Sequence, residues 1–195
     1  LDIIGRKASV EQVLTAYKLA REVGFDNINM DLILGLPGEL EADVQRTIEK
    51  IVELAPDSLT VHSLAIKRAS RLNQWIQENG VSMLHNTDET MKIAAAGAEK
   101  LGMKPYYLYR QKYMSGSFEN VGWTKPGGTG LYNIYIMEEL HSILSLGAGG
   151  STKMVGGGQI RRAFNAKYPR EYIDRPEKRR ANLMDFARFY AEQGE

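Results

Sequence analysis

Apolar residues recur along the first half of the chain at two spacings, that of helices and that of strands. Ser9 predicts a helix N-cap, with a glutamine three residues later that completes a capping box. Apolar residues at helical spacing follow as far as Gly24, which ends the helix. Alternation then predicts a buried strand over 28–34. Apolar residues on one face predict a second helix that stops before Pro56, and a second strand is expected over 59–64. Helix, strand, helix, strand at this spacing indicates a parallel α/β sheet.

The second half of the chain has a less regular pattern. A loop rich in Gly, Ser and Pro is expected to separate two groups of elements, and it is long enough to have a function. The expected elements are helices over 71–79 and 87–101, a short strand over 106–109, the extended loop over 115–130, a helix from Met137 to Leu146, a strand near 159–165 and a terminal helix over 177–192.

The segment from Gly24 to Glu39 is the most informative one. Its strand pattern places apolar side chains on one face and Asp31 on the other. A carboxylate is disfavoured in a strand and costly to bury unpaired, so a specific partner is expected. That partner is either a ligand, as at the carboxyl end of a barrel strand, or an interior salt bridge to Arg6 or Lys67. Pro37-Gly38 suits the centre of a type II turn.

Composition limits the classes of protein that fit. The 195 residues suffice for one substantial domain, alone or with a small appendage. A net charge of +1 indicates neither nucleic acid nor an anionic membrane as a partner, and no apolar run reaches the length of a membrane span. No cysteine is present, which excludes thiolate catalysis and a cysteine-ligated cluster within these residues. We expect a cytoplasmic location. The opening at Leu1, without Met, suggests the middle of a longer polypeptide.

Two further features have both a functional and a structural interpretation. The glycine cluster at 147–150 would bring backbone N–H groups to a polar ligand, or it would simply form a tight turn. The three histidines show no metal-ligand spacing and fit strand or surface positions better. They are His62, His85 and His141.

Aromatic and basic residues gather in two stretches. The stretch Tyr106–Lys112 combines tyrosines with two cations, as a site for a flat anionic ligand or as a half-buried edge strand. The stretch Arg161–Arg180 contains eight Lys or Arg against three Asp or Glu, as a surface for an acidic partner or as a solvated helix face.

Taken together, these segments resemble one family. The first half of the chain is similar to the catalytic domain of radical-SAM oxygen-independent coproporphyrinogen III oxidases. The segments that carry this similarity are IIGRK, AREVGFDNINMDLILGLPGE and LAPDSLTVHSLAIKRAS. YLYRQKYMSGSFENVGWTKPG and LGAGGSTKMV resemble its HemZ-like branch of coproporphyrinogen dehydrogenases, and the resemblance covers about residues 1–165. It implies an α/β fold: the second half of a partial (β/α) barrel over 1–68, then a family-specific α+β region over 69–195.

The resemblance also implies the cofactors. S-adenosylmethionine (SAM) and a four-iron–four-sulfur cluster lie inside the family's barrel. Because the chain has no cysteine, we expect the cluster ligands upstream of Leu1, and we expect this C-terminal fragment alone to be inactive. The residues that the resemblance assigns to SAM are Arg6, Asp31, Ala65, Gly147, Gly149 and Lys153.

The implied reaction is the oxidative decarboxylation of coproporphyrinogen III propionates to vinyl groups in haem biosynthesis, with an electron donor to the cluster as a partner. Cations would meet the substrate carboxylates. The candidates are Lys67, Arg68, Tyr109, Arg110 and Lys112, with Arg161 and Arg162 further along the chain. Two alternatives stay open: a haem chaperone like HemW on the same scaffold, and a non-catalytic scaffold domain.

Overall fold

The computed structural model divides the chain into two compact units, Leu1–Gly130 and Leu131–Glu195. The described residues are 8–66, 70–80, 84–110 and 115–193. This division follows packing, and the boundary after residue 68 between barrel and family-specific region remains a prediction.

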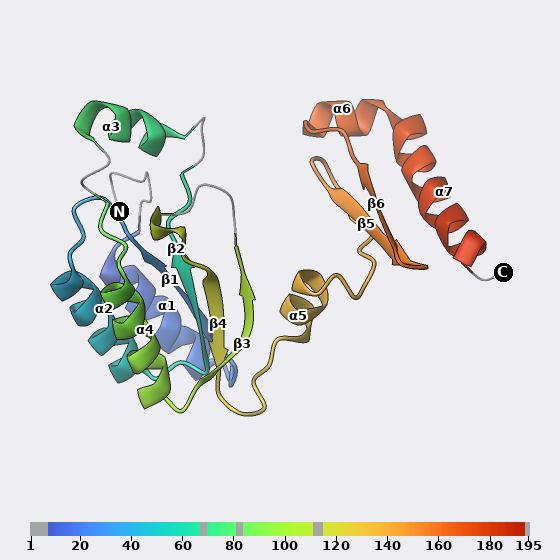
Figure 1. The fold of residues 1–195 in the computed structure, drawn as a ribbon. Helices are drawn as coiled ribbons and strands as arrows, with labels where there is room; N and C mark the ends of the chain where they lie inside the picture. Colours follow the sequence, from blue (N-terminus) through green and yellow to red (C-terminus); the bar gives the residue numbers. More distant parts are fainter. Residues whose placement is uncertain (1–7, 67–69, 81–83, 111–114, 194–195) are drawn as a thin grey trace. The chain divides into compact units, whose positions relative to one another are not determined.

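The first unit contains a four-stranded sheet in the order β1-β2-β4-β3 (Figure 1). Strands β1 and β2 are parallel, whereas β4 is antiparallel to both of its neighbours. The parallel helix–strand–helix–strand prediction for the start of the chain is thereby confirmed. The elements are α1 (Val10–Glu22), β1 (Asn29–Leu34), α2 (Glu41–Leu54), β2 (Ser58–Ser63), α3 (Arg71–Asn79), α4 (Asp88–Lys100), β3 (Lys104–Tyr109), the short turn η3 (Ser115–Ser117) and β4 (Asn120–Thr124).

The predicted capping box at the start of α1 and the predicted turn after β1 are both present. Ser9 Oγ accepts from the Gln12 N–H at 3.2 Å, and Gln12 Oε1 accepts from the Ser9 N–H at 2.9 Å, which forms the capping box of α1. After β1, the Glu39 N–H donates to the Leu36 carbonyl at 3.0 Å, and Gly38 has φ 75°, as a type II turn requires. The turn prediction is confirmed.

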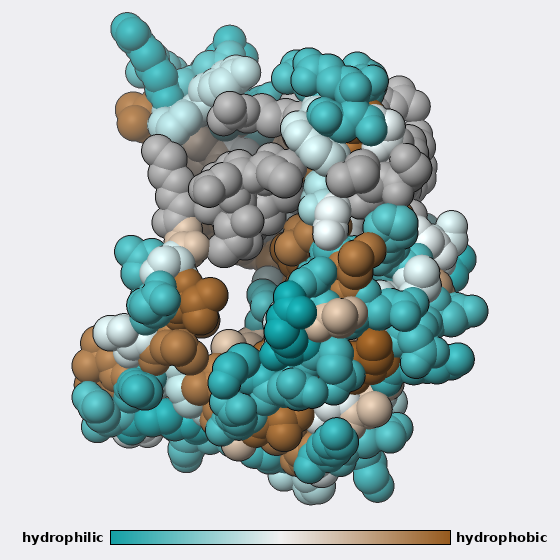
Figure 2. Space-filling model, turned by 90° about the vertical axis from the view of Figure 1, so that its left-hand side faces the viewer, coloured by the Kyte–Doolittle hydropathy of each residue, from teal (hydrophilic) through white to brown (hydrophobic). Residues whose placement is uncertain are grey.

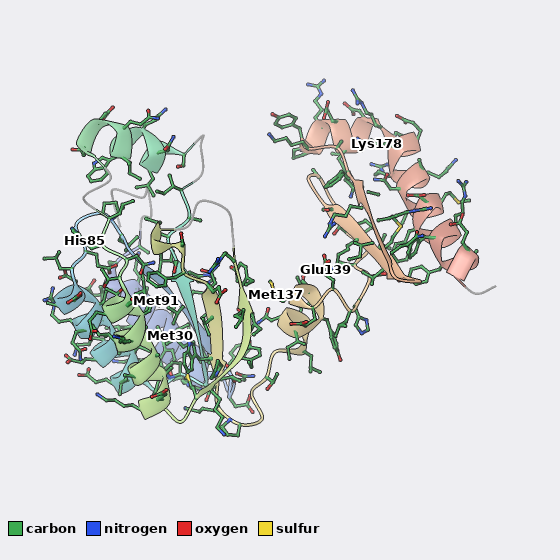
Figure 3. All side chains as sticks on the ribbon, viewed as in Figure 1. Met30, His85, Met91, Met137, Glu139 and Lys178 are labelled. Carbon is green, nitrogen blue, oxygen red and sulfur yellow. The ribbon has the colours of Figure 1, made fainter. Side chains whose placement is uncertain are left out.

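Helices α2 and α4 run side by side along one face of the sheet (Figure 1). Gly97 on α4 permits this approach, because a Cβ there would lie 2.3 Å from Ile48 Cγ2. Met30 on β1 and Met91 on α4 (Figure 3) are partly buried and pack against the hydrophobic core between these helices and the sheet. The buried residues of this core are Leu32, Leu34, Val44, Ile48, Ile51, Leu59, Val61, Ala94, Ala98 and Met103. Figure 2 looks onto this side and shows mostly hydrophilic side chains with hydrophobic groups between them.

One element predicted for the first unit was wrong. The segment 115–130 was expected to be an extended loop, yet it contains β4 between β2 and β3. Its sequence, NVGWT, has a glycine at the centre, which normally weakens a strand. The glycine is required here because a Cβ on Gly122 would lie 1.9 Å from the ring of Tyr107. The tyrosine stretch is confirmed as an edge strand, β3.

The second unit consists of a hairpin and three helices: α5 (Leu131–Met137), β5 (Ser151–Gly156), β6 (Gln159–Phe164), α6 (Pro169–Asp174) and α7 (Pro176–Gln193). Gly157 and Gly158 both have positive φ and join β5 to β6, as a two-residue type I′ hairpin turn demands. Strand β6 and the terminal helix confirm their predictions, whereas β5 was missed. Phe189 on α7 and Met154 on β5 are buried.

The predicted helix from Met137 was wrong, because α5 ends there. Glu139 adopts φ 52° and its N–H donates to the Ile136 carbonyl, while the Leu140 N–H donates to the Tyr135 carbonyl. These bonds form a Schellman motif, with a glutamate where glycine is usual. Arg162 holds the Glu139 carboxylate at 2.7 Å, and Figure 3 marks Glu139 just beyond α5. Across the described residues, no helix is both long and apolar enough to span a membrane.

Candidate functional site

Asp31 lies on β1, on the face of the sheet opposite the helices α2 and α4. Its side chain is 65% exposed, so the expectation of a buried charge was wrong: the buried residues of β1 are Leu32 and Leu34. The Asn29 amide donates to Asp31 Oδ1 at 2.8 Å. Arg6 and Lys67, the partners expected for Asp31, lie outside the described residues.

The structure gives Asp31 a different neighbour, His62 on β2. The distance from His62 Nε2 to Asp31 Oδ1 is 3.8 Å. Interaction with His62, followed by the hydrogen bond from Asn29, lowers the pKa of the Asp31 carboxyl against the opposing effect of burial. The carboxylate is therefore ionised at neutral pH and available to a cationic group or to hydroxyls.

The neighbouring strands continue this polar surface. Thr60 Oγ1 donates to Asn29 Oδ1 at 3.1 Å. The rings of Tyr107 and Tyr109 stack at 6.3 Å with an interplanar angle of 11°. Burial is the main cause that raises the pKa of the Tyr107 hydroxyl, which keeps it protonated. We refer to Asn29, Asp31, Thr60, His62, Tyr107 and Tyr109 together as the polar face.

The polar face combines hydrogen-bonding groups and aromatic rings from β1, β2 and β3, and Gly122 on β4 leaves room for the Tyr107 ring. A carboxylate and an amide suit an ammonium group or a pair of hydroxyls, and stacked tyrosines suit a flat ring. Sequence reasoning placed Asp31 and Tyr109 among the candidates but missed His62. The sequence does place His62 in the strand predicted to follow β1. Its position beside β1 depends on the register, which pairs Ile33 with His62.

Ala65, another predicted SAM contact, follows β2 directly. The Leu64 N–H donates to the Leu34 carbonyl at 3.0 Å, so the parallel pairing of β1 and β2 extends to this point. Ala65 thus lies near the carboxyl ends of both strands, the usual edge for ligands in parallel α/β sheets. Its contact with SAM remains a prediction, as does that of Arg6.

Among the predicted substrate residues, Arg110 forms an ion pair with Glu119 at 3.4 Å, and both side chains are exposed. Tyr109 faces His62: its hydroxyl oxygen lies 3.4 Å from His62 Nδ1. Lys67, Arg68 and Lys112 are outside the described residues.

The predicted residues of the second unit have internal partners. The Gly147 N–H donates to the Tyr172 hydroxyl at 3.1 Å and the Gly149 N–H to the Ala166 carbonyl at 2.8 Å. Both glycines have positive φ, as a tight turn requires. The side chain of Lys153 is 9% exposed, and its Nζ donates to the Ile136 carbonyl at 3.3 Å. The structural interpretation accounts for all three positions, and their contact with a ligand remains a prediction.

The basic stretch Arg161–Arg180 forms many of its ion pairs within its own unit. Arg161 lies near Asp185 and Glu192, and Arg162 near Glu139. Arg170 and Arg175 pair along α6 with acidic residues of the same segment. These contacts agree with a solvated surface.

The chain is similar to proteins of known family. The model of the Radical SAM superfamily matches residues 1–51, which include Asp31. The oxygen-independent coproporphyrinogen-III oxidase-like protein HemZ of Bacillus subtilis is 41% identical over 91% of this chain and 36% of its own length. The haem chaperone HemW of the same organism is 36% identical over 55% of this chain and 29% of its own length. The chain thus spans about a third of these relatives.

A solved structure has the same fold. The coproporphyrinogen III oxidase HemN of Escherichia coli, a radical-SAM enzyme, matches 91% of this chain and 40% of its own, with a TM-score of 0.61. Sequence identity in that comparison is 19%, so it supports the fold alone. The predicted α/β fold class of radical-SAM type is confirmed. From the 41% identity to HemZ over 91% of this chain and the match to the Radical SAM model, the chain belongs to the radical-SAM coproporphyrinogen III oxidase family.

Proposed function

We propose that the full-length protein is a radical-SAM enzyme that oxidatively decarboxylates propionates of coproporphyrinogen III to vinyl groups, with protoporphyrinogen IX as the product. The observation that carries this proposal is the 41% identity to the HemZ oxidase-like protein, which extends over 91% of the chain. The similarity therefore includes much of the second unit as well as the sheet.

The polar face suits SAM on the chemistry of its groups. The ionised Asp31 and the Asn29 amide match the ammonium and ribose hydroxyls of SAM, and the tyrosine rings match its adenine. We propose Arg6, Asp31 and Ala65 as its contacts, with Gly147, Gly149 and Lys153 as further ones. When bound, SAM and a four-iron–four-sulfur cluster supply the one-electron chemistry that removes a hydrogen atom from the propionate.

The cluster itself does not fit the residues of this chain. The sequence contains no cysteine, and the described residues contain no group of three His, Asp or Glu placed to hold a metal. Cysteines elsewhere in the full-length protein would hold the cluster, and a separate electron donor would reduce it.

Substrate binding requires cations, because coproporphyrinogen carries four carboxylates. We propose Arg110, with Tyr109 beside it, and also Lys67, Arg68 and Lys112. The ion pair of Arg110 with Glu119 is exposed at 61% and 44%, so it costs at most about 1 kcal/mol to exchange Glu119 for a substrate carboxylate.

A second candidate function is haem binding without decarboxylation, since a haem chaperone is 36% identical over 55% of the chain.

The test of the two functions is an anaerobic incubation of the reconstituted full-length protein with coproporphyrinogen III, SAM and a reductant. We expect protoporphyrinogen from the wild type, and at least a tenfold lower rate from Asp31→Asn than from the control Asp26→Asn on an exposed loop. Stable haem binding without turnover would instead support the chaperone. Neither activity would indicate a non-catalytic scaffold.

A further inference from the structure

Three side chains from three strands of the polar face lie in a line. The hydroxyl oxygen of Tyr109, on β3, is 3.4 Å from His62 Nδ1, on β2. The other nitrogen of that ring, Nε2, is 3.8 Å from Asp31 Oδ1, on β1. The imidazole therefore lies between a phenol and a carboxylate, with one ring nitrogen toward each.

Gly122 supports these contacts from the side. Strand β4 lies between β2 and β3, and its Gly122 is paired with Thr60 on one side and with Tyr107 on the other. Because Gly122 has no side chain, the ring of Tyr107 occupies the space above its backbone. Tyr107 also stacks on Tyr109. The Tyr109 ring is thus supported from the side in the position from which it reaches His62.

Both neighbours favour the same tautomer of the neutral imidazole. A carboxylate only accepts hydrogen bonds and a phenol donates readily, so a proton on Nε2, the nitrogen that faces Asp31, suits Asp31 and Tyr109 alike. Nδ1 is then an acceptor, and the Tyr109 hydroxyl is its donor. The Asn29 amide donates to the same carboxylate oxygen at 2.8 Å and completes its surroundings.

We propose that Tyr109 and His62 are positioning residues: Tyr109 selects the Nε2–H tautomer of His62, and His62 in turn holds the Asp31 carboxylate in the orientation that meets SAM. This inference rests on the proposed function, in that SAM is the ligand. It gives Tyr109, through its contact with His62, a role other than substrate binding.

The first experiment measures the SAM affinity of full-length, anaerobically reconstituted protein by equilibrium dialysis. Because the His62–Asp31 contact is partly exposed, we expect His62→Phe to weaken binding about three- to fivefold. His62→Gln keeps an N–H near the Nε2 position and should recover most of the affinity, whereas His62→Asn, whose amide is closer to Nδ1, should not. The control is His85→Phe, an exposed histidine on another segment (Figure 3), which should bind like wild type.

The second experiment reads the tautomer directly and does not depend on activity. In cluster-free full-length protein labelled with ¹⁵N-histidine, the His62 signals are assigned by their loss in His62→Gln. We expect a protonated Nε2 and an unprotonated Nδ1 for neutral His62, and a shift toward the Nδ1–H form in Tyr109→Phe. The exposed Tyr132→Phe should leave these signals unchanged.

The outcomes separate the two proposals. Failure of the wild type to bind SAM would overturn both. Binding by the wild type that His62→Phe leaves unchanged, or a neutral His62 that carries its proton on Nδ1, would overturn the positioning role alone. Weakened binding in His62→Phe with recovery in His62→Gln supports the proposal, and equal losses in His62→Gln and His62→Asn contradict it.

Discussion

The two faces of the four-stranded sheet are made from the same strands and serve different ends. On one face, Leu34 and Leu59 are fully buried beneath helices α2 and α4. On the other face, the same two strands carry Asp31 and His62, with Tyr109 from the edge strand. Because successive strand residues point to opposite sides, one alternating sequence supplies both a core and a binding surface. Stability and chemistry are thus separable by residue position, and substitutions on each face should have different consequences.

The largest expected effect is on the helix face. Leu34→Ala removes a fully buried side chain and should lower the free energy of unfolding by about 3–5 kcal/mol, as measured by urea denaturation. The matched control is Leu108→Ala on β3, which is 59% exposed and should change stability by less than about 0.5 kcal/mol. Similar losses at the two positions would contradict the described core.

A smaller effect is expected at the centre of the polar face. Gly122→Ala places a methyl group 1.9 Å from the Tyr107 ring and should cost about 1–3 kcal/mol of unfolding free energy. The cost arises because the tyrosine must move, so Tyr107→Ala in the same protein should remove most of it. A double-mutant cycle by urea denaturation measures this coupling. Additive losses would show that the ring does not occupy the space above Gly122.

The smallest expected effect is a change in pH dependence. Burial raises the pKa of Glu39, whose carboxylate accepts from the Gly35 and Leu36 N–H groups in the turn after β1. A raised pKa in the folded state means that its contribution to stability is present below the unfolded value of 4.5 and is lost as pH rises through the folded pKa. The stability of Glu39→Gln relative to wild type should therefore increase as pH rises above about 4.5.

Asp31 provides the comparison of opposite sign. Its folded pKa is lowered, chiefly by His62, so its contribution is present above the unfolded value of 3.8 and is lost as pH falls through the folded pKa. Asp31→Asn should therefore be less stable than wild type at neutral pH and approach it in acid. Unfolding free energies of both variants across pH 3–7, measured at about unit intervals, check the two signs. Slopes of the same sign would contradict the assignment.

Sequence reasoning succeeded where a local signal determines the structure. The capping box at Ser9, the turn at Pro37-Gly38 and the alternation over 28–34 each depend on neighbouring residues, and each is confirmed. It failed for β4, whose central Gly122 is explained only by the ring of Tyr107, a tertiary contact. It also failed for the helix after Met137, because Arg162 holds Glu139 from a distant strand.

The candidate site shows the same division. Asp31 stood out in the sequence because a carboxylate in a strand is unusual. His62 did not, because its relation to Asp31 and Tyr109 depends on strand order and register. A histidine in a strand has no special meaning until its neighbours across the sheet are known.

The order of the strands also has a consequence for the time at which the site forms. Strands β1 and β2 are close in sequence and can pair as soon as residue 63 has left the ribosome. Strand β3, although made next, has no place in the sheet until β4 follows it, because β4 lies between β3 and β2. The contact of Ser58 with Thr124 closes a separation of 66 residues, which is slow compared with local pairing. The tyrosines are thus the last part of the polar face to join the sheet during synthesis. Until then, His62 and Asp31 lack the contact with Tyr109.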